Sequence, residues 1–169
     1  TYYRNGPLGP DVMAAAELQQ GITLYSMGEH AAALPHFERS VELVPSNPRA
    51  EFHLGVIHHS LNHPDAAIQH FRAALNLDPG MVDARFNLGL VLFANQQFSL
   101  ASETFEQVIA DRPEDAEAHF YLSSSLKQLG KLEEAAKQLE EAVRLRPNFE
   151  AAMKELRSLQ AEPSAEPRP

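Results

Sequence analysis

The sequence predicts an all-α protein built from four helix–turn–helix repeats. Four prolines recur at a constant step of 34 residues with no insertion between them, namely Pro45, Pro79, Pro113 and Pro147. Small and large apolar residues recur at the same step, and a repeat of this length is typical of stacked helix pairs. The composition, 44% hydrophobic and 22% charged, is that of a soluble globular chain.

Four further columns repeat in phase with the prolines. One holds small residues, a second alanine, a third large apolar residues, and a fourth mainly small residues. Their members are Gly21, Gly55, Gly89 and Ser123; Ala33, Ala67, Ala101 and Ala135; Phe37, Phe71, Phe105 and Leu139; and Ser40, Ala74, Val108 and Ala142. Five columns in phase over four copies establish an internal repeat.

The repeat resembles the tetratricopeptide-repeat (TPR) family over Ala14 to Phe149. The best copies are His53-Leu54-Gly55, then Ala67 to Leu75, closed by Leu77-Asp78-Pro79. The resemblance implies a right-handed α-solenoid with repeats at 14–47, 48–81, 82–115 and 116–149. Two columns depart from the family pattern: Glu17, Glu51, Arg85 and His119 are polar, and Leu24, His58, Leu92 and Leu126 replace an aromatic residue.

Each column has a physical reason. The small residues let two helices of one repeat approach closely, and the large ones fill the wedge between successive repeats, each worth roughly 1.5–3 kcal/mol when buried. The prolines end the second helix of each repeat. Gly28, Asn62 and Gly130 suit a left-handed turn between paired helices. Gln96 fits that turn less well and predicts a strained or wider turn.

The two ends read as solenoid ends. Residues 1–10 hold two glycines and two prolines and predict an irregular segment, with Asp11 as N-cap of the first helix. Residues 11–160 form the predicted solenoid, in which 150–160 are an amphipathic capping helix. Residues 161–169 predict a disordered, proline-rich tail. Pro35 lies either in the first turn of its helix or at a bend.

Composition excludes several classes of function. A net charge of −9 disfavours nucleic acid, and the absence of cysteine removes disulfides and thiolate chemistry. No apolar run reaches the roughly 18 residues of a membrane span. We therefore expect a soluble protein, cytoplasmic or periplasmic. The chain begins at Thr1, so we expect a processed chain or an excised piece from which any signal segment is gone.

The resemblance implies that the first helix of each repeat lines a concave groove. Carried onto this chain, the groove residues are aromatic and aliphatic with few charges: Leu18, Gln19, Ile22, Tyr25, Phe52, His53, Val56, His59, Phe86, Asn87, Leu90, Phe93, Phe120, Tyr121, Ser124 and Lys127. Such a surface suits a partner helix or peptide with apolar anchors. Lys127 is its one cation, which disfavours a carboxylate clamp, and Asn87 is expected to pair with a partner backbone. Alternatively, the aromatic rings pack only against neighbouring helices.

Other candidate sites carry less weight. His59 and His63 have the spacing of a helical metal pair, but zinc needs three or four ligands. His58 is expected to replace an aromatic, and His36 and His70 to face solvent. His53 and His59 would make groove affinity sensitive to pH near 6. The carboxylate pairs Glu133-Glu134 and Glu140-Glu141 are explained by i, i+4 pairing with neighbouring cations. No catalytic motif is present, so we expect no enzyme, no metal and no cofactor.

The sequence therefore predicts a scaffold that binds a protein partner in this groove. Two alternatives stay open. The chain is instead a regulatory or substrate-docking segment of a larger enzyme, although an asparagine ladder of the kind found in glycosyltransferase arrays is reduced here to Asn87. Or it is a self-assembling scaffold that forms homo-oligomers through its groove or its ends.

Overall fold

The computed structural model describes residues 9–161, and within this range the ordered elements are all helices. They are α1 (Pro10–Ser26), α2 (His30–Leu43), α3 (Pro48–Ser60), α4 (Pro64–Leu77), α5 (Val82–Ala94), α6 (Phe98–Asp111), α7 (Ala116–Gln128), α8 (Leu132–Leu145) and α9 (Glu150–Ala161). Across this part of the chain, none of the helices is long and apolar enough to cross a bilayer.

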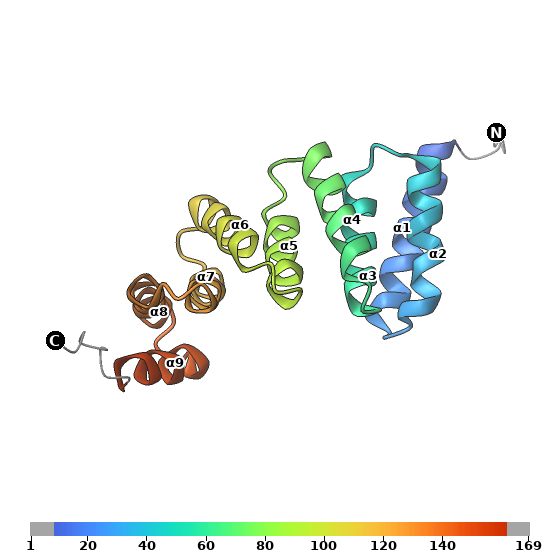
Figure 1. Cartoon of the computed structure of the whole chain (residues 1–169). Helices are drawn as coiled ribbons and strands as arrows, with labels where there is room; N and C mark the ends of the chain where they lie inside the picture. The colour runs from blue at the N-terminus through green and yellow to red at the C-terminus, as the bar shows by residue number, and fades with distance from the viewer. Residues whose placement is uncertain (1–8, 162–169) are drawn as a thin grey trace. The chain divides into compact units, whose positions relative to one another are not determined.

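The chain divides within α5 into two compact units, one ending at Val91 and the other beginning at Leu92. In the first unit, α1 packs on α2, α2 on α3, and α3 on α4, so that neighbours along the chain are neighbours in space (Figure 1). In the second unit, the same relation holds for α6, α7, α8 and α9. Each unit is therefore a stack of antiparallel helix pairs.

The large residues of the repeat form the centre of each pair. Phe37, Phe71 and Phe105 are completely buried, and Leu139 is 1% exposed. Phe37 and Phe71 lie against glycines on the preceding helix, where a Cβ on Gly21 or Gly55 would come within 2.6 Å of the ring. The predicted close approach of paired helices is thus present in both repeats of the first unit.

The turns inside the repeats share one geometry. Residues 28, 62, 96 and 130 all have positive φ, between 58° and 81°. In each turn the N–H of this residue bonds the carbonyl three residues earlier at 3.0 Å, as in Gly28 to Tyr25. The next N–H bonds the carbonyl five residues earlier, which is the Schellman pattern. Of the two alternatives predicted at Gln96, the wider turn is not found and the strained turn is, because Gln96 takes the same left-handed conformation as the glycines although it carries a Cβ.

The structure settles the details left open at the amino end and in α2. The first helix begins at Pro10 with Gly9 as N-cap, so Asp11 lies in the first turn and is not the cap. Pro35 lies inside α2, beyond its first turn. Residues 1–8, predicted to be irregular, lie outside the described residues.

At the carboxyl end, α9 includes Ala161, one residue more than the predicted capping helix. Its Ala152 is completely buried beside Leu139 and Ala142, with Leu156 and Leu159 packed around them. The apolar face of α9 therefore covers the last helix pair of the second unit. The remaining residues of the predicted tail, 162–169, lie outside the described residues.

Candidate functional site

The predicted groove residues lie on α1, α3, α5 and α7, the first helices of the four repeats. Most of them are half-buried, which leaves part of each side chain accessible. Two differ. Leu18 is 7% exposed and belongs to the core with Ala33 and Phe37, so it offers little surface. Gln19 and His59 are exposed.

In the first unit, Phe52 and His53 continue the buried core outward. The His53 ring stacks on Phe37, with centroids 5.2 Å apart and planes 6° from parallel. Phe52 contacts His53 edge to face and Phe71 at 5.9 Å. These two residues therefore contribute to the packing between helices and also to the accessible surface. For them, the alternative that the rings pack against neighbouring helices is partly correct.

The surroundings of His53 keep its imidazole neutral. Burial of the ring, and next the positive charge of Arg49, lower the pKa of His53 to about 4. His53 therefore carries no charge between pH 5.5 and 8. In the unbound protein, His53 therefore does not undergo the change of charge near pH 6 on which the prediction for this residue rested.

Helix α1 contributes Ile22 and Tyr25, both packed against the core of the first unit. The Tyr25 ring stacks on His30 of α2 at 4.8 Å, and its hydroxyl lies 3.4 Å from Oγ of Ser60 at the end of α3. Tyr25 is thus fixed from both sides and presents a rigid, half-exposed aromatic surface. Sequence reasoning missed Ser60 and His30, since neither occupies a repeated column of the motif.

The part of α5 in the first unit carries Phe86, Asn87 and Leu90, all half-buried. Asn87 Nδ2 donates a hydrogen bond to the carbonyl oxygen of Asp83 in the same helix, at 2.8 Å. The carboxamide is therefore oriented by its own helix. Pairing of Asn87 with a partner backbone remains a prediction.

The second unit contains a chain of aromatic contacts. Phe93 lies 5.5 Å from Phe98 and 6.3 Å from Tyr121. Tyr121 stacks on the buried Phe105 at 5.6 Å and meets Phe120 at 5.4 Å. Tyr121 on Phe105 repeats the stacking of His53 on Phe37, because both pairs occupy the same two columns of the repeat. A planar ring in this column therefore packs on the large residue of the preceding repeat.

Helix α9 completes the surface of the second unit. Phe120 contacts Phe149 at 5.0 Å, and the guanidinium of Arg146 lies over the Phe149 ring at 4.8 Å. Lys127 Nζ lies 2.7 Å from Oε2 of Glu155, which neutralises the one cation among the groove residues. Glu155 was missed, although it is 34 residues after Tyr121 and a repeat frame extended into the capping helix would have placed it there.

The histidines of the second repeat meet in a different combination from the predicted one. His58, not His59, pairs with His63, and their Nδ1 atoms are 3.3 Å apart. The His58 ring also stacks on His70 at 5.2 Å, with planes 1° from parallel. His58 thus takes the place of an aromatic, as predicted. Among the described residues, no group of three or more metal-ligating side chains could hold a metal ion.

In the first two repeats, a glutamate on the first helix bonds a histidine on the second helix of the same repeat. His36 Nδ1 lies 2.7 Å from Oε2 of Glu17, and His70 Nδ1 lies 2.8 Å from Oε2 of Glu51. In both pairs the ring nitrogen donates, because a carboxylate only accepts. His36 and His70 are half-buried in these pairs, so the prediction that they face solvent is wrong.

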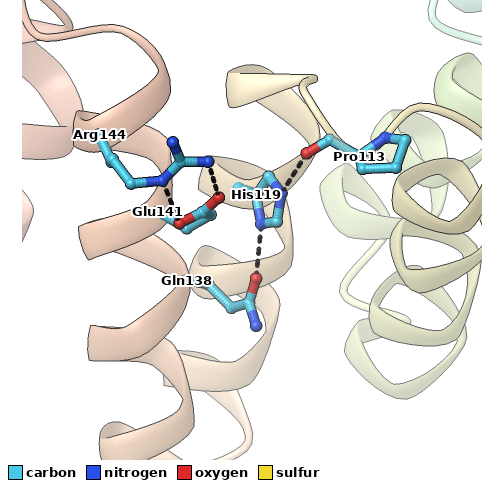
Figure 2. Close-up of polar contacts among 5 residues, drawn as sticks. All are labelled: Pro113, His119, Gln138, Glu141 and Arg144. Atoms are coloured by element: carbon cyan, nitrogen blue, oxygen red, sulfur yellow. Dashed lines mark hydrogen bonds and ion pairs between the residues drawn. The ribbon is translucent and has the colours of Figure 1, made fainter.

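In the fourth repeat, the corresponding bond joins a histidine on the first helix, His119, to Gln138 on the second helix (Figure 2). His119 is 6% exposed, and its Nε2 donates to the carbonyl of Pro113 at 3.1 Å, which fixes the proton on that nitrogen. Its Nδ1 lies 2.7 Å from Oε1 of Gln138. The second bond is satisfied when the ring is protonated, or when the carboxamide of Gln138 turns its nitrogen toward a neutral ring.

One carboxylate of each pair on α8, Glu134 or Glu141, meets a cation, and the spacing is i, i+3 and not the predicted i, i+4. Glu141 accepts two hydrogen bonds from Arg144, which Figure 2 shows, and these bonds lower the pKa of its carboxyl. Lys131 lies 3.9 Å from Glu134. Both are pairs of neighbouring surface side chains on one exposed helix face, an arrangement typical of helix stabilisation.

Comparisons with known proteins agree with this architecture. A search of curated proteins finds no match. The family model of the tetratricopeptide repeat matches residues 18–82, 59–101 and 86–149. Among solved structures, MamA residues 41 to the end from Desulfovibrio magneticus RS-1 superposes with a TM-score of 0.84 at 23% identity, covering 88% of this chain and 84% of that one.

Two further solved structures are similar. YrrB, described as a TPR protein with an unusual peptide-binding site, has a TM-score of 0.77 at 25% identity, over 88% of this chain and 81% of that one. PilF of Pseudomonas aeruginosa has a TM-score of 0.78 at 23% identity, over 89% and 68%. The predicted fold class, an all-α solenoid of repeats, is thereby confirmed. The chain belongs to the tetratricopeptide-repeat family.

Proposed function

We propose that this protein is a non-catalytic interaction scaffold that binds an apolar helix or peptide of a partner protein through the groove residues. Membership of the TPR family and the likeness to YrrB, whose structure is described as having a peptide-binding site, support the role of a protein-interaction scaffold. The partner's identity follows from neither. No cofactor, metal or nucleic acid is part of this proposal.

One observation carries the proposal: in each unit, most of the groove residues are half-exposed aromatic and aliphatic side chains, without unbalanced charge. In the first unit, the set holds no acidic or basic side chain apart from its histidines, and His53 is kept neutral. In the second, Lys127 is paired with Glu155. Partly buried aromatic side chains in a fixed orientation are typical anchors at protein interfaces. A carboxylate clamp would need cations that this surface does not offer.

Self-assembly is the second candidate, and the exposed faces of α1 and α9 bear on its end-to-end form. Gln20 and Thr23 of α1 are exposed and polar, whereas the inner repeats hold Leu54 and Ile57 at these positions, both buried. At the other end, Arg157 of α9 occupies the glycine column and is exposed. Met13 and Met27, at the same helical spacing as Gln20 and Thr23, are exposed apolar residues at 38% and 66%, so this face is mixed and leaves end-to-end contact open to test. Use of the groove by a second copy remains open to test.

The experiment selects peptides from a random display library on the whole protein and then measures binding of a selected peptide by calorimetry. The test variant is Val56→Glu, which puts a charge among the half-buried groove residues of α3. The matched control is Gln69→Glu, an exposed position on α4 outside the groove set. Both variants must keep the helical content and melting temperature of the wild type.

We expect apolar anchors in the selected peptides and a loss of affinity of at least about tenfold in Val56→Glu alone, since a buried unpaired charge is costly at an interface. Equal affinity in all three proteins would show that the peptide binds elsewhere. Sedimentation of the unliganded protein tests the second candidate. A monomer whose mass does not depend on concentration would exclude self-assembly.

A further inference from the structure

We propose that the three histidines His58, His63 and His70 form an acid-sensitive latch that holds the two helices of the second repeat together at neutral pH. No other repeat has this set: the positions equivalent to His58 hold leucine, and those equivalent to His63 hold Glu29, Gln97 and Lys131. The latch joins α3 to α4 and so belongs entirely to the first unit.

The geometry of the latch depends on its protonation state. The Nδ1 atoms of His58 and His63 are 3.3 Å apart, so one ring donates and the other accepts. A proton can therefore occupy only one of these two nitrogens while the bond persists. When both rings become imidazolium, two N–H groups and two positive charges face each other, and the bond must break.

The second contact of the latch, between His58 and His70, also depends on the protonation of the rings. His58 and His70 stack in parallel with centroids 5.2 Å apart. Two neutral imidazoles pack well in this arrangement, whereas two charged rings repel at this separation. His70 is held in place by its Nδ1–H bond to Glu51 at 2.8 Å. His58 on α3 is half-buried, and its ring packs on His70 of α4, so this contact joins the two helices.

The charged groups around His58 come from three helices. Burial of the ring, and next the charges of His70 and His63 from the α4 side, lower the pKa of His58, whereas Glu38 of α2 acts to raise it. The Glu51 carboxylate on α3 is bound to His70. Because the folded-state pKa lies below the ordinary value of 6.5, the unfolded chain takes up the proton first. Stability from this site is complete above pH 6.5 and is lost as the pH falls below it.

The cluster is a proton site and not a metal site on this geometry. Only two ring nitrogens converge, and no group of three or more ligands exists among the described residues. Helix α3 also carries Phe52, His53 and Val56, so opening of the latch would disturb this part of the proposed groove. The latch itself does not depend on the proposed function, because it is a property of the folded chain alone.

The test compares thermal unfolding of the whole protein at pH 7.5 and pH 5.0, in EDTA, for the wild type and His58→Leu. Leucine is the residue that the other three repeats hold at this position. The matched control is His59→Gln, the exposed neighbour outside the latch. Acidification is expected to lower the melting temperature by about 2–4 °C less in His58→Leu than in the wild type. His59→Gln should behave as the wild type.

A second readout separates titration from packing. In the His63→Gln variant, the NMR titration midpoint of His58 should rise toward the ordinary value, because one neighbouring charge is removed. Contributions of other histidines, including His53, are common to all variants and cancel in the comparison. An equal acid-induced fall in melting temperature in wild type and His58→Leu, or an unchanged His58 midpoint in His63→Gln, would overturn the proposal.

Discussion

The Phe71 ring occupies the space that a side chain at Gly55 would need. An ideal Cβ on Gly55 would lie 2.6 Å from Cδ1 of Phe71, and the same distance separates a Cβ on Gly21 from Cε1 of Phe37. The fourth repeat holds Ser123 and Leu139 in these two columns, and both are buried. A larger residue in the glycine column therefore occurs together with a smaller one in the phenylalanine column.

This relation predicts that Gly55→Ser and Phe71→Leu compensate each other. Gly55→Ser should lower the free energy of unfolding by about 1–3 kcal/mol, because the serine overpacks a completely buried contact. Phe71→Leu should also destabilise, by leaving a cavity. The free energy of unfolding of the double variant should exceed the value expected from adding the two single effects by at least about 0.5 kcal/mol. Urea denaturation of the four proteins measures this coupling, and strict additivity would contradict it.

The sequence predicts most of the fold because the same columns recur in every repeat. The paired helices approach closely at Gly21 and Gly55 as predicted, and the turns at Gly28 and Gly130 are left-handed. A residue type that recurs at the same position in every repeat indicates a contact that every repeat makes. The repeat length and the family follow from these columns.

The site could be predicted less well, since it depends on residues that differ among the repeats. Nothing in the columns indicates that His58 would stack on His70, and Glu155, which pairs with Lys127, is found only when the repeat frame is extended into α9. Such contacts join side chains on different helices, and their geometry follows from the packing angle and not from the spacing. Leu18 was assigned to the groove from its column, yet it lies in the core, because one face of α1 also packs on α2.

We predict that replacing Gln96 by glycine stabilises the protein. The φ of 58° at Gln96 is a left-handed conformation that costs a residue with a Cβ about 1–2 kcal/mol, while glycine adopts it without strain. Glycine also loses more entropy on folding, by roughly 0.5–1 kcal/mol. Gln96→Gly should therefore raise the free energy of unfolding by about 0.5–1 kcal/mol in urea denaturation.

The reverse change at an equivalent turn is the control for this prediction. Gly130 has a φ of 75°, and a Cβ there would meet no neighbour within 4 Å. Gly130→Ala should thus destabilise through the backbone conformation alone, by about 1 kcal/mol. If Gln96→Gly destabilised the protein, the Gln96 side chain would have to contribute contacts that outweigh the backbone strain.

The lowered pKa of His53 predicts a definite pH range for its effect on stability. The unfolded ring takes up a proton near the ordinary value of 6.5, whereas the folded ring does so at about 4. Stability contributed by neutral His53 is complete above 6.5 and is lost as the pH falls from 6.5 toward 4. In an NMR titration, the His53 ring signals should stay unchanged down to about pH 5. A midpoint near 6.5 would contradict the burial of this ring on Phe37.

We predict that replacing Pro35 by glutamine also stabilises the protein. Pro35 lies inside α2, where it has no N–H to bond the carbonyl of Ala31 and where its ring crowds the preceding turn. The side chain is exposed, so a replacement loses no core packing. The second repeat holds Gln69 at the equivalent position. Pro35→Gln should raise the free energy of unfolding by up to about 3 kcal/mol, measured by urea denaturation.

The reciprocal variant Gln69→Pro tests whether the cause is the helix backbone. It introduces the same defect at an exposed position of α4 and should destabilise by about 3 kcal/mol or more. Opposite signs for the two variants would assign the effect to the missing hydrogen bond and the steric crowding. If Pro35→Gln left stability unchanged, the proline would have to restrict the unfolded chain by as much as it disturbs α2, since proline also reduces the entropy of the unfolded state.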